Sequence, residues 1–159
     1  MLRRFRRGVR RRSDGTFDVR LDERERELLE TLSTQVRGLI EGAQDGEEAN
    51  LRRLFPPTYG DDPAQDAAYQ VMFGDELRQS RLAAIDRLCA TARQDHIDEE
   101  EAVAWMQAIN AVRLVLGTHL DIDEDPKPVS PRHPDAPMYY AYEYLGIQLY
   151  DLVTAMSQQ

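Results

Sequence analysis

The stretch DEEEAVAWMQAINAVRLVLGTHL, residues 98–120, decides the fold because it predicts the central helix of the chain. Asp98 is followed by Glu101 at the spacing of a capping box, and three glutamates in the first turn favour the helix dipole. Apolar side chains then recur at steps of three and four residues, which is the spacing of one buried helix face: Ala102, Trp105, Met106, Ile109, Val112 and Leu116. We therefore predict a mainly α protein built around this helix.

Helical patterns also lie on both sides of this stretch. A helix over about 22–41 carries an apolar stripe of Leu28, Leu29, Leu32, Val36, Leu39 and Ile40, with Glu23, Arg26, Glu27 and Glu30 off that stripe. A short helical turn is predicted around 47–54. A further helix starts at Pro63, pauses at Gly74, and resumes from 75 to about 92 with Leu77, Ala84, Ile85 and Leu88 facing inward. With the helix near the C-terminus, the prediction is a bundle of five or six helices.

The N-terminus reads as a short β-hairpin. Phe5, Val9, Phe17, Val19 and Leu21 share odd positions around the loop Ser13–Asp14–Gly15. A three-residue loop with Gly15 in the left-handed conformation places Arg12 opposite Thr16, Val9 opposite Val19 and Asp18 opposite Arg10. The second face of this hairpin then carries only arginines besides Asp18, and no aromatic residue: Arg4, Arg6, Arg10, Arg12 and Arg20.

Composition predicts one soluble domain over residues 1–159, with a basic hairpin (1–21), a helical core (22–120), a proline-rich acidic linker (121–137) and a C-terminal helix that begins near Ala136 and fills 138–157. Residues 1–20 hold eight arginines against Asp14 and Asp18, a charge of +6, so the net charge of −9 leaves −15 on residues 21–159. We expect a cytoplasmic protein, because the chain has no apolar run of about eighteen residues and the basic start is followed by more arginine.

The residues offer no constellation for a named reaction. His96, His119 and His133 lie in different segments, so we predict no metal, no cofactor and no catalytic residues. Asn110 and Arg113 are polar positions in an apolar helix, and we expect Arg113 to pair with Asp61 or Asp62; an anion pocket is the alternative.

Two further features concern a thiol and a loop. Cys89, the only cysteine, is either a small core residue or a free thiol activated by Arg87 or Arg93. The proline-rich segment Phe55–Tyr59 is expected to pack on the helix that holds Trp105.

Three segments in combination are similar to a known family: LRRLFPPTYGDDP (51–63), DELRQSRLAAI (75–85) and AWMQAINAVRLVLGTHL (104–120). Over residues 5–152 the chain resembles an actinobacterial family with a domain of unknown function. The resemblance implies a small helical protein often encoded beside the Clp protease adaptor ClpS, with no established catalytic activity. It also implies an oxidative-stress transcriptional regulator with a redox pair of cysteines. Because this chain has Cys89 alone, the redox part of that inference does not transfer.

These observations favour a non-enzymatic regulatory or adaptor protein that acts through protein contacts. The first alternative is DNA binding through the arginine face, although those arginines can also satisfy acids of the same chain; an unrecognised hydrolase is a remote alternative. Tyr139, Ile147 and Tyr150 lie off the core stripe of the last helix, and this surplus aromatic surface predicts a homodimer with that helix or the helix over 22–41 at the seam.

Overall fold

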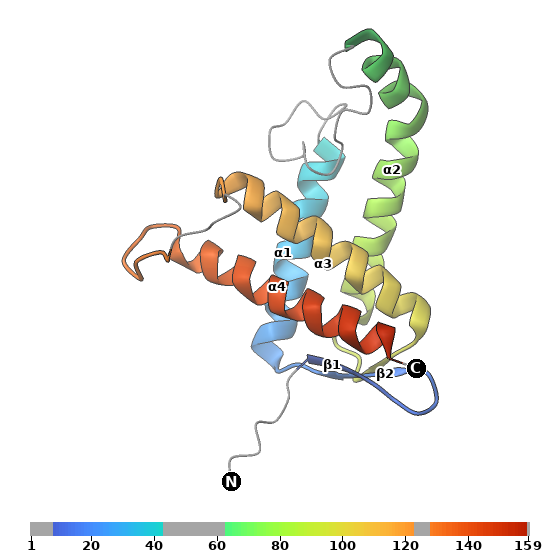
Figure 1. The fold of residues 1–159 in the computed structure, drawn as a ribbon, viewed down its shortest axis with the longest axis vertical. Helices are drawn as coiled ribbons and strands as arrows, with labels where there is room; N and C mark the ends of the chain where they lie inside the picture. Colours follow the sequence, from blue (N-terminus) through green and yellow to red (C-terminus); the bar gives the residue numbers. More distant parts are fainter. Residues whose placement is uncertain (1–7, 43–62, 123–127, 159) are drawn as a thin grey trace.

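The computed structural model describes residues 8–42, 63–122 and 128–158, which form four helices and a small three-stranded sheet (Figure 1). The predicted fold class, mainly α with an N-terminal hairpin, is confirmed. The predicted count of five or six helices is wrong for the residues that the structure describes, since they hold four.

The hairpin has the predicted register. Strand β1 (Gly8–Arg11) pairs antiparallel with β2 (Phe17–Arg20), with Val9 opposite Val19 and Arg10 opposite Asp18. Gly15 has a φ of 85°, the left-handed conformation expected of the loop glycine, and the Arg12 amide donates to the Thr16 carbonyl at 2.7 Å. Consequently the apolar face is buried against the helices, whereas Arg10, Arg12 and Arg20 are exposed.

A third strand was not predicted. β3 (His96–Ile97) pairs with β2, and the Val19 amide donates to the Asp95 carbonyl at 2.8 Å. Two residues are too few to show alternation, so this strand is invisible in the sequence pattern. The strand order β1-β2-β3 leaves β1 at an edge of the sheet.

Helix α1 (Glu23–Gly42) agrees with its predicted span to within one residue. Asp22 and Glu25 cap it reciprocally: the Asp22 amide donates to Glu25 Oε2 at 2.8 Å, and the Glu25 amide donates to Asp22 Oδ1 at 2.9 Å. Leu29, Val36 and Ile40 are buried, as the stripe predicts.

Helix α2 (Pro63–Thr91) begins at the predicted proline but passes through Gly74 without a break. The predicted pause is wrong because glycine keeps its backbone N–H, so within a helix it costs only about 1 kcal/mol relative to alanine. Further along, Ala84, Ile85 and Leu88 are buried as predicted.

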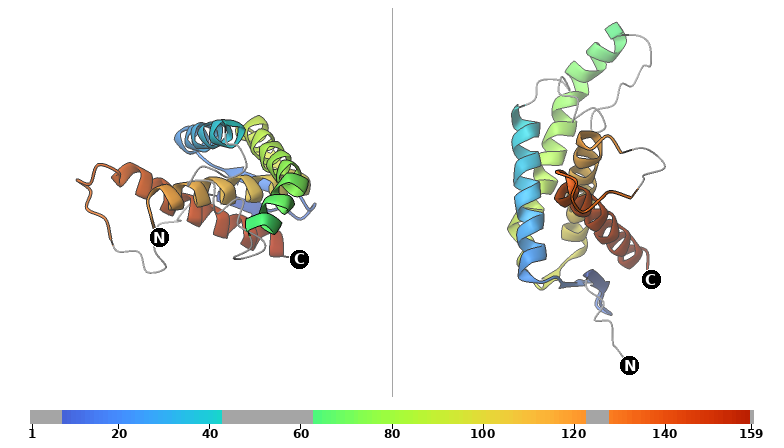
Figure 2. Two further views of the ribbon diagram at one scale, coloured as in Figure 1. Left: turned by 90° about the horizontal axis from the view of Figure 1, so that it is seen from above. Right: turned by 90° about the vertical axis from the view of Figure 1, so that its left-hand side faces the viewer.

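Helix α3 (Glu99–His119) is the central helix, in contact with α1, α2 and the last helix, α4 (Ala136–Ser157) (Figures 1 and 2). The Asp98–Glu101 capping box is present. Trp105 is 1% exposed and its indole N–H donates to Thr91 Oγ1 at 2.6 Å, which joins α3 to the end of α2.

Arg26 was predicted to lie off the buried stripe of α1, and that prediction is wrong. It is 7% exposed. Its guanidinium donates to four carbonyl oxygens and one carboxylate, at Leu21 (3.1 Å), Ala92 (3.0 Å), Gln94 (2.8 Å), Val19 (3.2 Å) and Asp95 Oδ1 (3.1 Å). The N-terminal end of α1 lies where β2, the end of α2 and the turn before β3 meet, and these carbonyls supply the acceptors that allow a charge to be buried.

Several predictions lie outside the described residues. They concern the helical turn around 47–54, the packing of Phe55–Tyr59, and the acceptors Asp61 and Asp62. Part of the linker, 128–135, is described and forms turns that lead into α4.

Candidate functional site

A cleft of about 670 Å³ lies between the hairpin and the C-terminal half of α4. Five residues from the two strands of the hairpin line one wall: Val9, Arg10, Arg11, Asp18 and Arg20. Helix α4 contributes the opposite wall: Tyr150, Asp151, Thr154, Ala155 and Gln158. We call this site the basic cleft, because three guanidinium groups line it against two carboxylates.

Gly8 lets the two walls approach each other. Its φ of 118° is a conformation that residues with a side chain rarely adopt, and a Cβ built there would lie 2.9 Å from Asp151 Oδ2. Arg11 adds a second connection, because its Nη1 donates to the Met156 carbonyl at 3.4 Å near the end of α4. The guanidinium of Arg11 also lies 5.7 Å from the centre of the Phe17 ring.

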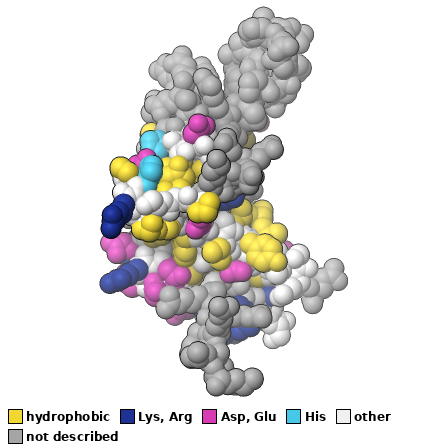
Figure 3. All heavy atoms as spheres, turned by 60° about the vertical axis from the view of Figure 1, so that its left-hand side comes forward, with side chains coloured by type: hydrophobic (Ala, Val, Ile, Leu, Met, Phe, Trp, Pro, Cys, Tyr) yellow, Lys and Arg dark blue, Asp and Glu magenta, His cyan; other side chains and the backbone are white. Residues whose placement is uncertain are grey.

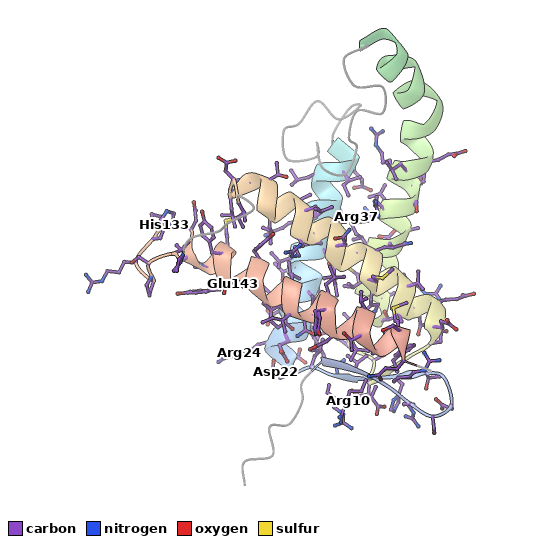
Figure 4. The ribbon with its side chains drawn as sticks, in the orientation of Figure 1. Arg10, Asp22, Arg24, Arg37, His133 and Glu143 are labelled. Atoms are coloured by element: carbon purple, nitrogen blue, oxygen red, sulfur yellow. The ribbon has the colours of Figure 1, made fainter. Side chains whose placement is uncertain are left out.

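The exposed arginines of the hairpin differ in their partners. Arg12 Nη1 lies 3.2 Å from Asp18 Oδ1, and Arg20 Nη2 lies 3.9 Å from Asp18 Oδ2. His96 Nδ1 is 2.8 Å from the same Asp18 Oδ1. Among the described residues Arg10 forms no ion pair, and Figure 4 shows it extending from the hairpin away from the helices. The hairpin therefore satisfies part of its own charge and leaves part available; Arg4 and Arg6 lie outside the described residues.

An aromatic side chain does stand beside the arginines, contrary to the expectation from the hairpin alone. Tyr150 of α4 borders the basic cleft and is 73% exposed. Tyr150, Asp151, Thr154 and Gln158 were not predicted as site residues, because the pattern of the hairpin gives no sign that α4 lies beside it.

The large hydrophobic side chains that are exposed in the described residues all lie on α4: Tyr140, Ile147, Tyr150 and Val153. We call them the α4 row. Ile147 and Tyr150 were predicted to lie off the core stripe. Tyr139 was also predicted there, but it is half-buried, its hydroxyl donates to the Leu120 carbonyl at 3.3 Å, and its ring packs edge-on against His133. Figure 3 shows one face of the molecule, on which exposed hydrophobic side chains lie among acidic ones.

Arg113 lies between α3 and α4. Its guanidinium is 4.5 Å from the centre of the Tyr142 ring, and a Cβ built on Gly146 would lie 3.3 Å from its Nε. The Nε is buried without a hydrogen-bond partner. Asn110, one turn away, is half-buried. The expected pairing of Arg113 with Asp61 or Asp62 stays a prediction, since those acids lie outside the described residues.

Cys89 is a half-buried residue of α2, and burial raises the pKa of its thiol above the ordinary value. The two cations proposed to activate it have other partners. Arg93 pairs with Glu23 and, at 3.1 Å, with Glu30, while Arg87 lies 3.9 Å from Glu101. This environment favours the protonated thiol over the thiolate.

We expect Cys89 to react slowly with iodoacetamide in the folded protein. A raised pKa keeps the thiol protonated to higher pH. The alkylation rate should therefore begin to rise at a higher pH in the folded protein than in the denatured chain. Rates measured from about pH 7 to pH 10, across the ordinary thiol pKa, test this expectation. A midpoint below that of the denatured chain would contradict it.

The described ranges, 8–42, 63–122 and 128–158, lack two further features. They contain no group of three or more His, Cys, Asp or Glu side chains that could hold a metal ion. They also contain no helix long and apolar enough to cross a membrane.

Together, the helical core and the small sheet define a mainly helical protein with two accessible surfaces, the basic cleft and the α4 row. The chain belongs to the family described as "Domain of unknown function (DUF2017)", which matches residues 3–156. The resemblance found in the sequence is thereby confirmed at the level of the family.

Relatives of this chain carry regulatory names. It is 31% identical over 132 residues to "Putative oxidative stress regulator AosR" of Mycobacterium leprae, an alignment that covers 72% of this chain and 61% of that protein. It is 27% identical over 146 residues to "Oxidative stress regulator AosR" of Mycobacterium bovis and of Mycobacterium tuberculosis, covering 80% of this chain and 67% of theirs. The chain thus spans about three fifths to two thirds of the length of these relatives. No solved structure matches it.

Proposed function

We propose that this protein is a non-enzymatic regulator of the oxidative-stress response that acts in the cytoplasm through protein–protein contacts. The names of the relatives support the regulatory part. The observation that carries the mode of action is the α4 row. Exposed aromatic and aliphatic side chains on one helix are the composition typical of protein interfaces rather than of free surface.

The α4 row also suits a homodimer. Tyr140, Ile147 and Tyr150 follow each other at steps of seven and three residues, which keeps them along one side of a helix. Two copies of this helix can pack antiparallel about a two-fold axis near Ile147, which is 59% exposed.

We expect the protein to sediment at micromolar concentration as a dimer, at twice the monomer mass of 18.3 kDa. Ile147→Asp should sediment as a monomer, because the substitution places two carboxylates across the proposed axis in an apolar contact. In the host, the same variant should reproduce the oxidant sensitivity of a strain lacking the gene.

Ser80→Asp is the matched control, since it adds the same charge at an exposed position of α2. It should leave both the mass and the oxidant resistance unchanged. A monomeric wild-type protein would overturn the homodimer and leave the α4 row as a docking face for another protein. Full oxidant resistance with Ile147→Asp would overturn the proposal that the row mediates regulation.

DNA binding is the second candidate function. Tyr150 beside Arg10 and Arg20 favours it, because nucleic-acid surfaces combine cations with exposed aromatic rings. The net charge of −9 opposes it, since the rest of the chain repels phosphates. Binding of a random duplex that collapses as salt is raised to physiological concentration would support it.

A further inference from the structure

We propose that the basic cleft binds an extended acidic peptide segment of a partner protein, which adds a strand to the outer edge of β1. This inference rests on the proposed function, because it assigns a chemistry to one of the protein contacts through which the regulator acts. It concerns a different surface from the centre of the α4 row.

Strand β1 has an outer edge that no other strand of the described sheet pairs with. In an antiparallel pair, residues alternate between exchanging hydrogen bonds with the neighbouring strand and pointing their peptide groups away from it. The Arg12–Thr16 hydrogen bond fixes this alternation, so Val9 and Arg11 direct their peptide groups away from β2. Val19, opposite Val9, shows the same alternation, because its amide donates toward β3.

No hydrogen bond joins the outward peptide groups of Val9 and Arg11 to another residue within the described ranges. Both residues line the basic cleft; Val9 as a whole residue is 7% exposed and Arg11 is half-buried, so Arg11 offers the more accessible peptide group. The cleft therefore runs along an unpaired strand edge, which is the template for strand addition by an extended peptide.

The three arginines of the basic cleft favour a ligand with carboxylates. Arg10 is unpaired among the described residues, and Arg20 has only a 3.9 Å contact with Asp18. Within the described ranges Arg11 makes a 3.4 Å hydrogen bond to a neutral carbonyl and a contact with the Phe17 ring, but no ion pair. Carboxylates of a bound peptide would give these guanidinium groups shorter, charge-assisted hydrogen bonds.

Two carboxylates of the cleft favour a peptide over a nucleic acid as its ligand. The carboxylates of Asp18 and Asp151 line the same cleft, and they would repel the regularly spaced phosphates of a nucleic acid. A peptide can instead place amide donors beside these carboxylates. Its alternating side chains can meet the arginines on one side and Thr154 and Gln158 of α4 on the other. The volume of about 670 Å³ suits a few residues.

The test uses a fluorescein-labelled peptide of about eight residues that alternates glutamate and leucine, a length that exceeds the four residues of β1. Fluorescence anisotropy should show saturable binding to the full chain. A peptide of the same sequence with every second amide N-methylated keeps its charge but cannot pair along one edge, and it should bind at least about tenfold more weakly.

Two variants alter the cleft from opposite walls. Arg10→Glu combined with Arg20→Glu, and separately Thr154→Glu on α4, should each weaken peptide binding at least about tenfold. Thr154→Glu leaves the hairpin unchanged, so it keeps the inference testable if the double variant disturbs the sheet. Arg132→Glu is the control for a charge reversal away from the cleft. Arg132 is exposed in the turn that precedes α4, beside His133, which Figure 4 shows at the far end of α4 from the hairpin, and the variant should change the affinity less than about twofold.

Absence of saturable peptide binding would overturn the inference. Equal weakening by Arg132→Glu would also overturn it, because the attraction would then be non-specific. Tighter binding of a random DNA duplex than of the peptide, lost in the cleft variants, would overturn it in favour of nucleic acid. These results are independent of the host phenotype of Ile147→Asp, so failure of the cleft assignment and failure of the proposed function can be told apart.

Discussion

Replacing Arg26 by methionine is expected to lower the free energy of unfolding by about 3–5 kcal/mol, because a buried acceptor left without its donor costs about 1–3 kcal/mol and Arg26 serves four carbonyls. Methionine fills a similar volume but donates no hydrogen bond, so the four carbonyls that now accept from the guanidinium lose their donor. Denaturant unfolding followed by the fluorescence of Trp105, the single tryptophan, measures the change.

A matched control separates the carbonyl hydrogen bonds from the ion pair. Asp95 is the carboxylate partner of Arg26, and its side chain is 81% exposed. Asp95→Asn should therefore cost far less than Arg26→Met, because water already solvates that carboxylate. Arg26→Lys should fall between the two variants, since an ammonium cannot reach all five acceptors at once. A loss below about 1 kcal/mol for Arg26→Met would contradict this account, because it would be no more than one ordinary hydrogen bond.

Trp105→Ala is expected to destabilise the fold by a similar amount, about 3–5 kcal/mol, the usual cost of emptying a buried tryptophan site. The side chain is 1% exposed and packs at the crossing of α2 and α3. The indole N–H also donates to Thr91 Oγ1, whose own hydroxyl donates to the Arg87 carbonyl at 2.7 Å. Circular dichroism has to replace fluorescence as the probe, because the variant removes the tryptophan.

Trp105→Phe separates the two contributions. It keeps most of the apolar volume and removes the N–H donor, while the Thr91 hydroxyl keeps its own acceptor. It should therefore cost clearly less than Trp105→Ala, as expected for one hydrogen bond and a partial cavity. Equal losses for the two variants would show that the hydrogen bond to Thr91, rather than packing, dominates.

Local signals in the sequence predicted local structure well. The Asp98–Glu101 box, the glycine loop of the hairpin and the Val9–Val19 register all depend on residues a few positions apart, and the structure has each of them. Glycine was overestimated as a helix breaker at Gly74, whereas proline at residue 63 was correctly placed at the start of α2.

Features that depend on distant parts of the chain could not be predicted. Arg26 looks like a solvent-facing charge until β2 and the end of α2 surround it with carbonyls. The basic cleft needs residues of β1 and α4 to meet, and no periodicity within either segment indicates that pairing. The arginines of the hairpin wall were therefore predictable from the sequence, whereas the α4 wall, including Tyr150, was not.

The contact between Arg11 and Met156 spans 145 positions of the chain, and it has a consequence for how the protein is made. During synthesis β1 leaves the ribosome well before its docking surface on α4 is translated. Contacts of such large sequence separation form slowly, because the loop between them must be closed before they contribute stability. The nascent chain therefore carries an undocked cationic strand until α4 has been translated.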